Sequence, residues 1–216
     1  MIAAMPTDIR EQLLAQRVIP VLRLASAELT ERAARCIAAA GFTTVEITLT
    51  VPGAIDLIRR LARDSAPGFA VGAGTVLDLN AAQRCIDAGA RFVVSPCLVP
   101  GMAKIAHAAG CAALIGGYTP GEILAAQREG ADLVKVFPAS TGGPEHVRAL
   151  HAVFPDILLC PTGGVSQQNM EAYFAAGAAL VGVGNNIVDQ KALRAGDEAR
   201  AAEHARAFLR PAKAPG

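Results

Sequence analysis

Strand-like apolar runs alternate with helical patterns along this chain, and this repeat constrains its fold more than any other feature. The runs begin near Val18, Thr43, Phe69, Arg91, Ala112, Asp132, Ile157 and Ala179. An Ala-rich pattern of helical period follows each run and ends in a glycine or a polar turn. The runs are apolar throughout, which is typical of parallel strands buried on both faces. Eight such units, spaced by about 20 to 26 residues, predict an α/β fold of the (β/α)8 TIM barrel type rather than an open doubly wound sheet.

The chain of 216 residues fits one such barrel if its loops are short. We therefore predict a single domain over residues 1–216, with the barrel at about 18–210. Ile9, Leu13 and Leu14 recur at helical spacing ahead of the first strand, which predicts an extra N-terminal helix over about residues 6–16. The segment Arg210–Gly216 contains two prolines, and we expect it to form a frayed tail.

Composition and charge exclude several function classes. Apolar residues make up 52% of the chain and charged residues 18%, and the net charge of +1 offers no basic surface for nucleic acid or a membrane. No signal-peptide pattern stands at the start, and no apolar run reaches the roughly 18 residues of a membrane helix. The five cysteines lack C-x-x-C spacing, which argues against a disulfide framework and a zinc site. We expect a cytoplasmic enzyme that binds small molecules.

Lys135 lies in the middle of a predicted strand. Residues 132–138 read DLVKVFP, so apolar residues flank the lysine on both sides. Burial disfavours the ammonium form of a lysine and leaves a nucleophilic amine that can form a Schiff base with a carbonyl compound. The alternative is a lysine that only extends from the end of a strand to solvent.

Glu46 is the second charged residue inside an apolar strand, in the run Val45–Ile47. An unpaired carboxylate is costly there unless it is protonated or has a partner. One interpretation is a general acid/base, with a pKa raised by burial, that transfers protons beside Lys135. The other is a buried ion pair with Arg23 or Lys135.

Chemistry in a (β/α)8 barrel takes place where the strands end. The polar residues and short motifs predicted there are Arg23, Glu46 with Thr48, Thr75, Ser95–Pro96, Lys135 with Phe137, Thr162–Gly164 and Gly182–Asn185. The glycine turns after the seventh and eighth strands allow backbone N–H groups to approach an anion closely, which favours a phosphate site over two ordinary turns.

The other candidates indicate no further chemistry. The four histidines, His107, His146, His151 and His204, share no face or ligand spacing, so we predict packing or surface roles and no metal site. Cys97 lies near the strand ends without a neighbouring histidine, and we do not predict a catalytic thiol.

Five short motifs carry a resemblance to a known enzyme family. They read VEITLTVP (45–52), VGAGTV (71–76), VSP (94–96), VKVFPA (134–139) and CPTGGV (160–165). In this order they resemble the class I family of 2-keto-3-deoxy-6-phosphogluconate (KDPG) aldolases and 4-hydroxy-2-oxoglutarate aldolases. The resemblance runs from about Val18 to the final helix, and five motifs in register are specific although each alone is weak.

The resemblance implies a (β/α)8 barrel, usually homotrimeric, that needs no metal or cofactor. It implies cleavage of a phosphorylated 2-keto-3-deoxy sugar acid to pyruvate and glyceraldehyde 3-phosphate. Lys135 matches the Schiff-base lysine of the family, and Glu46 matches its proton-transferring glutamate. The positions that match substrate-binding residues are Thr75 and Thr162, with Pro96 and Phe137 at the pyruvate pocket and Gly163, Gly164, Gly184 and Asn185 at the phosphate end.

Two departures from the family pattern bear on the substrate. Thr50 stands where many members have an arginine that holds the substrate carboxylate, and we expect Arg23 to supply that charge. Asn185 stands where the second phosphate loop often has a serine, and its amide and the backbone can still donate.

Several alternatives stay open at this point. The main substrate can be 2-keto-3-deoxy-6-phosphogalactonate or 4-hydroxy-2-oxoglutarate. A phosphosugar isomerase or epimerase on the same fold would use Glu46 as its base and Lys135 only as an electrostatic partner. A phosphometabolite-binding protein without turnover is the third alternative.

Overall fold

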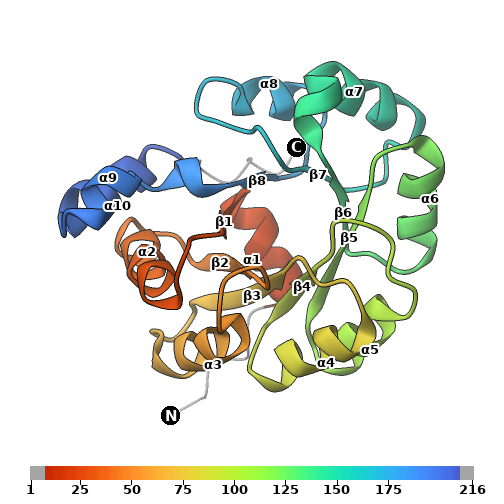
Figure 1. Cartoon of the computed structure of the whole chain (residues 1–216). Coiled ribbons are helices and arrows are strands. Elements are labelled where there is room, and N and C mark those ends of the chain that lie inside the picture. The colour runs from red at the N-terminus through yellow and green to blue at the C-terminus, as the bar shows by residue number, and fades with distance from the viewer. Residues whose placement is uncertain (1–7, 210–216) are drawn as a thin grey trace, which may run out of the picture.

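Eight parallel strands form a barrel that helices surround (Figure 1). The structure is a computed structural model, and it describes residues 8–209. The strands are β1 (Val18–Leu22), β2 (Thr44–Thr48), β3 (Ala70–Gly74), β4 (Phe92–Val94), β5 (Ala112–Gly117), β6 (Leu133–Val136), β7 (Leu159–Pro161) and β8 (Val181–Val183). Their order is β7-β6-β5-β4-β3-β2-β1-β8, and a parallel bridge between Thr162 and Gly182 joins the two ends of this order. The predicted (β/α)8 fold is confirmed.

Helices follow the strands on the outside of the barrel, and one further helix, α1, precedes the first strand at the end of the barrel (Figure 1). They are α1 (Ile9–Gln16), α2 (Ala27–Ala39), α3 (Ala54–Asp64), α4 (Leu79–Asp87), α5 (Met102–Ala108), α6 (Pro120–Arg128), α7 (Ala139–Val153), α8 (Met170–Ala175), the 3₁₀ turn η1 (Asn185–Ile187), α9 (Gln190–Arg194) and α10 (Glu198–Arg206). The strands begin within two residues of their predicted starts. The predicted N-terminal helix corresponds to α1, whereas residues 6 and 7 and the predicted tail Arg210–Gly216 lie outside the described residues.

Apolar side chains fill two layers, because each strand is buried on both faces. The interior of the barrel contains Ile19, Val21, Phe92, Leu114 and Leu133. Gly72 on β3 leaves room for this packing, since a Cβ there would overlap the ring of Phe92. The second layer lies between the strands and the helices and includes Val45, Ile47, Leu57 and Ile58.

Helix α1 closes the N-terminal end of the barrel. Its residues Ile9 and Leu13 pack against the interior cluster. Gln16, at the end of α1, is 8% exposed and donates from Nε2 to the carbonyl oxygen of Val18 and to the hydroxyl of Thr44, both at 2.6 Å. Its Oε1 accepts from the backbone N–H groups of Thr43 and Thr44 at 2.6 and 3.0 Å. One side chain thus ties the closing helix to the first two strands.

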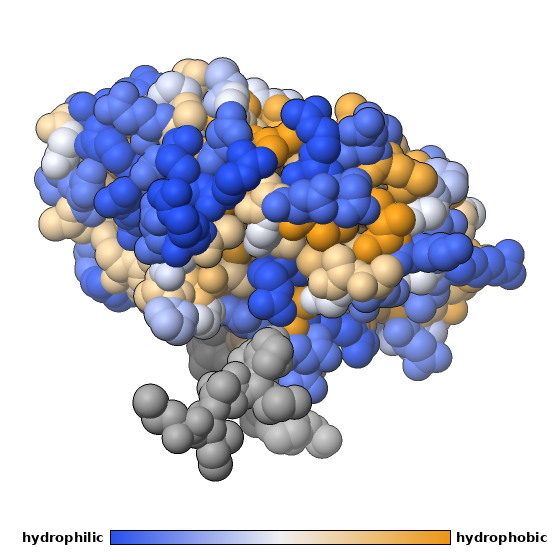
Figure 2. All heavy atoms as spheres, turned by 90° about the horizontal axis from the view of Figure 1, so that it is seen from below, coloured by the Kyte–Doolittle hydropathy of each residue, from blue (hydrophilic) through white to orange (hydrophobic). Residues whose placement is uncertain are grey.

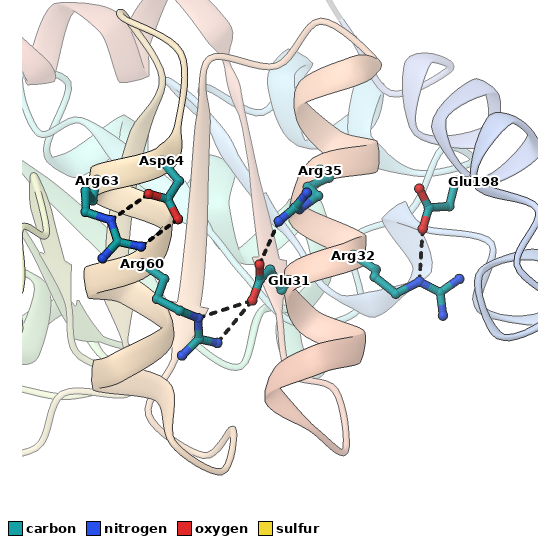
Figure 3. Close-up of polar contacts among 7 residues, drawn as sticks. All are labelled: Glu31, Arg32, Arg35, Arg60, Arg63, Asp64 and Glu198. Atoms are coloured by element: carbon teal, nitrogen blue, oxygen red, sulfur yellow. Dashed lines mark hydrogen bonds and ion pairs between the residues drawn. The ribbon is translucent and has the colours of Figure 1, made fainter.

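Ion pairs connect helices on the outer surface. Figure 3 shows Glu31 of α2 between Arg35 of the same helix and Arg60 of α3, at 2.8 and 3.0 Å. The hydrogen bonds from Arg35 and Arg60 lower the pKa of the Glu31 carboxyl group. Arg32 of α2 pairs in the same way with Glu198 of α10, at 2.9 Å. These pairs connect helices on the outside of the barrel, and none of them lines the cavity at the carboxyl ends of the strands.

The surface is mixed in character. Figure 2 shows the side that α3, α4 and α5 cover, where hydrophobic residues gather between hydrophilic ones. None of the helices within residues 8–209 combines the length and the apolar character that crossing a bilayer requires.

Candidate active site

Lys135 projects into the barrel from β6. It pairs in register with Gly116 of β5 and Cys160 of β7, and it is 5% exposed. Its neighbours Val134 and Val136 pack in the layer between strands and helices, so the alternation of the strand directs Lys135 to the interior. The sequence therefore buries an amine at the end of the barrel where the βα loops begin.

Glu46 meets this amine from β2. Its Oε1 lies 3.9 Å from Nζ of Lys135, and the residue is 2% exposed. Oε1 has no hydrogen-bond partner among residues 8–209. Burial raises the pKa of the Glu46 carboxyl group, and the charges of Lys135 and Arg23 oppose this increase only in part. Gly74 makes the arrangement possible, because a Cβ at that position would overlap the carboxyl group.

A cavity of about 320 Å³ opens at the carboxyl ends of the strands beside this pair. Its lining contains eight of the predicted site residues: Arg23, Lys135, Phe137, Thr162, Gly163, Gly164, Gly184 and Asn185. Nζ of Lys135 lies 5.4 Å from the centroid of the Phe137 ring. The two glycines after β7 have φ angles of +94° and +79°, which side chains rarely permit. This conformation explains why the sequence has Gly163-Gly164 there.

Arg23 and Thr75 approach one another near Glu46. Arg23 follows β1, and its Nη2 lies 3.4 Å from the hydroxyl oxygen of Thr75. Thr75 follows β3 and has a positive φ of 59°. The side chain of Asn185 bonds to the backbone of Arg23, with its Oδ1 accepting at 2.8 Å and its Nδ2 donating at 2.6 Å.

Thr162 and Cys160 are neighbours on the inner side of β7. The Thr162 hydroxyl donates to the carbonyl oxygen of Cys160 at 3.3 Å and lies 3.7 Å from its sulfur. Burial raises the pKa of the Cys160 thiol to about 12, so this thiol is protonated at neutral pH. Gly182 on β8 gives Thr162 its space, because a Cβ there would overlap the threonine side chain.

Four predicted site residues do not line the cavity. Glu46 and Thr75 lie behind the lining and contact residues that belong to it, Glu46 contacting Lys135 and Thr75 contacting Arg23. The Thr48 hydroxyl donates to the carbonyl oxygen of Leu22 at 3.2 Å and lies 2.8 Å from the Thr50 hydroxyl, so it bonds within the strand ends. Pro96 packs beside Gly116, where a Cβ would overlap its backbone. Their predicted roles toward the substrate stay predictions.

Four residues that line the cavity had no role of their own in the sequence analysis. They are Val21, Val165, Ser166 and Asn186. Val165, Ser166 and Asn186 are within three residues of the predicted glycine turns, which is the only signal that indicated them. Val21 is one of many valines on the strands, and nothing in its surroundings in the sequence distinguishes it.

The other candidates take structural roles. Nε2 of His107 lies 2.8 Å from Asp132, His146 stacks on Tyr118, and Nε2 of His204 lies 2.9 Å from the carbonyl oxygen of Asn186. Within residues 8–209, no group of three or more His, Cys, Asp or Glu side chains is placed to hold a metal ion. A larger groove of about 530 Å³ lies between α2 and α3, beside the amino-terminal ends of β2 and β3, and it contains none of the predicted site residues.

The fold and this site define the chain as a (β/α)8-barrel enzyme that presents a buried amine and a buried carboxyl group to a small substrate. Residues 9–203 match the family described as "Aldolase: KDPG and KHG aldolase". The chain belongs to this family of lyases, and the resemblance drawn from the five motifs is confirmed.

Individual relatives agree with this family. A probable 2-dehydro-3-deoxy-6-phosphogalactonate aldolase from Rhizobium meliloti is 35% identical over 83% of this chain and 85% of its own length. A 2-dehydro-3-deoxy-phosphogluconate aldolase from Pseudomonas aeruginosa is 38% identical over 74% of this chain and 72% of its own. The crystal structure of a KDPG aldolase from Legionella pneumophila, with pyruvate captured as a covalent carbinolamine intermediate, is similar with a TM-score of 0.85 and 29% identity. That similarity covers 95% of this chain and all of the Legionella chain.

Proposed function

We propose that this chain is a class I aldolase in which Lys135 forms the Schiff base and Glu46 transfers protons. The observation that carries the proposal is the buried pair itself, with 3.9 Å between Nζ of Lys135 and Oε1 of Glu46. The carbinolamine in the Legionella relative supports the same chemistry. We propose 2-keto-3-deoxy-6-phosphogluconate-type compounds as substrates, with pyruvate and glyceraldehyde 3-phosphate as products.

The steps follow from the two groups. The neutral amine of Lys135 attacks the C2 ketone, and loss of water from the carbinolamine gives an iminium ion. Glu46 removes the proton of the C4 hydroxyl group through a water molecule, and the electrons of the C3–C4 bond move to the iminium. The aldehyde leaves, the resulting enamine takes a proton at C3, and hydrolysis releases pyruvate and the free amine. The raised pKa of Glu46 suits a group that must both accept and return a proton.

The two ends of the substrate have different partners in this proposal. Arg23 holds the carboxylate with Thr75, since a charge-assisted hydrogen bond is stronger than a neutral one. The glycine turns at Gly163-Gly164 and Gly184 accept the phosphate, with Phe137, Pro96 and Thr162 around the pyruvyl part. The strongest support for the phosphate end is the pair of positive φ angles, which bring backbone to the cavity wall.

A galactonate-type substrate is the second candidate. The Rhizobium relative has the name of a 6-phosphogalactonate aldolase, and Thr50 replaces the arginine that many members carry. A steady-state comparison of kcat/KM for the gluconate, the galactonate and 4-hydroxy-2-oxoglutarate decides between the three substrates. An isomerase or epimerase, or a binding protein without turnover, has no support beyond the shared fold.

Borohydride trapping tests the proposed chemistry. Pyruvate with borohydride should inactivate the enzyme and add the mass of a reduced pyruvyl group to the peptide that contains Lys135. Lys135→Arg should keep the charge and the fold but abolish turnover, because a guanidinium group is not a usable nucleophile at neutral pH. Modification of another peptide, or none, would reject the Schiff base at Lys135.

We also propose that the protein is a homotrimer in the cytoplasm. Leu77 and Leu98, on the loops after β3 and β4, are 60% and 38% exposed, and Leu79 at the start of α4 is 41% exposed. Such apolar surface supports an interface with other copies of the chain. The five cysteines are all free thiols, which supports a reducing compartment.

A further inference from the structure

The side-chain amide of Asn185 forms two hydrogen bonds within the protein. Its Oδ1 accepts from the N–H group of Arg23 at 2.8 Å, and its Nδ2 donates to the carbonyl oxygen of the same residue at 2.6 Å. A primary carboxamide carries its acceptor and its donor on two different atoms, so it can bond to the N–H group and the carbonyl oxygen of one residue at once. The two bonds hold the backbone of residue 23 in one orientation.

These bonds lie where the barrel joins its first and last strands. β1 and β8 pair in register, with Pro20 opposite Val183, and Arg23 and Asn185 follow shortly after these residues. The next residue in the turn, Asn186, donates from Nδ2 to the carbonyl oxygen of Val165 at 3.0 Å. Two consecutive amides therefore bind the β8 loop to two different loops, Asn185 to the loop after β1 and Asn186 to the loop after β7.

We propose that Asn185 is a positioning residue for Arg23 and so serves the carboxylate end of the site. Its two bonds fix the backbone from which the guanidinium group reaches Thr75 at 3.4 Å. This inference rests on the proposed function, in which Arg23 holds the carboxylate. It differs from the expectation that the Asn185 side chain binds phosphate, because its loss must weaken the binding of every 2-keto acid, phosphorylated or not.

Asn185→Ala should therefore raise KM by a similar factor, ~10-fold for the loss of two hydrogen bonds, for KDPG and for the same sugar acid without phosphate. The pyruvate concentration that gives half-maximal borohydride trapping should rise by that factor too. Asn186→Ala is the matched control, since it removes the neighbouring amide that holds the loop of the glycine pair. It should raise KM for the phosphorylated substrate alone.

A double-mutant cycle separates positioning from a general structural role. In an Arg23→Met background, Asn185→Ala should leave the half-maximal pyruvate concentration unchanged, because the group it positions is gone. Hydrogen exchange at the Arg23 amide should become faster in Asn185→Ala, while exchange in β2 and β6 stays at the wild-type rate.

Two results would overturn the inference: a KM increase confined to the phosphorylated substrate, or full additivity with Arg23→Met. Failure of the proposed function has a different signature, because the wild-type enzyme itself would then not be trapped by pyruvate and borohydride.

Discussion

Oε1 of Glu46 lies 3.9 Å from Nζ of Lys135, but it receives no hydrogen bond from any residue within 8–209. A carboxyl group in this position exchanges protons readily, since the barrel stabilises its charged form only in part. Glu46→Gln should lower the rate of aldol cleavage by roughly 10²- to 10⁴-fold, while borohydride trapping at Lys135 persists. Single-turnover kinetics with mass spectrometry measures both. Cleavage at nearly the wild-type rate would assign proton transfer to another group.

The same carboxyl group should make stability depend on pH. Burial raises its pKa in the folded state, so the folded protein binds this proton more tightly than the unfolded chain does. The free energy of unfolding of the wild type, relative to Glu46→Gln, should therefore decrease as the pH rises above the ordinary glutamate pKa of about 4.3. It should stay level at lower pH, where both states hold the proton. Urea unfolding between acidic and neutral pH gives this difference, and an increase with pH would contradict it.

Arg23 offers the third test at the scale of single residues. Arg23→Met should raise KM for 2-keto acid substrates by about 10- to 100-fold, because it removes a charge-assisted hydrogen bond to the carboxylate. Arg17→Met is the matched control, since Arg17 lies over the Phe174 ring at 4.0 Å and outside the cavity lining. An unchanged KM with a shifted pH profile of kcat would show that Arg23 tunes Glu46 instead.

At the scale of elements, α1 is held to the barrel through Gln16. Gln16→Ala leaves the Thr43 and Thr44 N–H groups and the Val18 carbonyl group without this partner, and it should lower the free energy of unfolding by about 3 kcal/mol. Gln83→Ala is the control, because this exposed glutamine of α4 makes one side-chain bond, to Asp87, and should change stability by less than about 0.5 kcal/mol. If urea unfolding showed equal effects of both substitutions, the idea that Gln16 holds α1 to the barrel would be wrong.

The elements show what the sequence can and cannot predict. Strands such as β1 and β5 begin at the predicted residues, because a strand buried on both faces is a continuous apolar run. The segment after β8 differs from the single Ala-rich helical pattern expected there, since it divides into η1, α9 and α10. Asp189 and Asp197 cap the last two helices with side-chain bonds to backbone N–H groups, and such caps depend on tertiary placement as much as on sequence.

The candidate site shows the same limit on what the sequence can predict. Lys135 and Glu46 could be predicted because a charge inside an apolar strand is costly and conspicuous. Thr48 could not be placed, because a strand hydroxyl can bond to a neighbouring carbonyl oxygen, here that of Leu22, as well as to a ligand. The bonds between Asn185 and Arg23 join residues 162 positions apart, so no local pattern encodes them.

At the scale of the whole molecule, a charge introduced into the proposed trimer interface should dissociate the trimer. Leu79→Asp should convert the trimer to a monomer in light scattering, because a carboxylate in an apolar interface stays unpaired. Val153→Asp is the control, since Val153 is 67% exposed at the end of α7, a different helix from that of Leu79. Dissociation by both variants, or by neither, would contradict an interface at Leu79.

The pairing of the first strand, β1, with the last strand, β8, also has a consequence for protein synthesis. The ribosome makes Arg23 early and Asn185 late, whereas Glu46 and Lys135 emerge between them. A nascent chain that has released six strands already contains both proposed reacting groups, but the proposed positioning of Arg23 by Asn185 requires the loop after the eighth strand. In the proposed mechanism, a chain that stops before β8 would therefore carry the proposed Schiff-base lysine without an oriented Arg23 to hold a keto acid beside it.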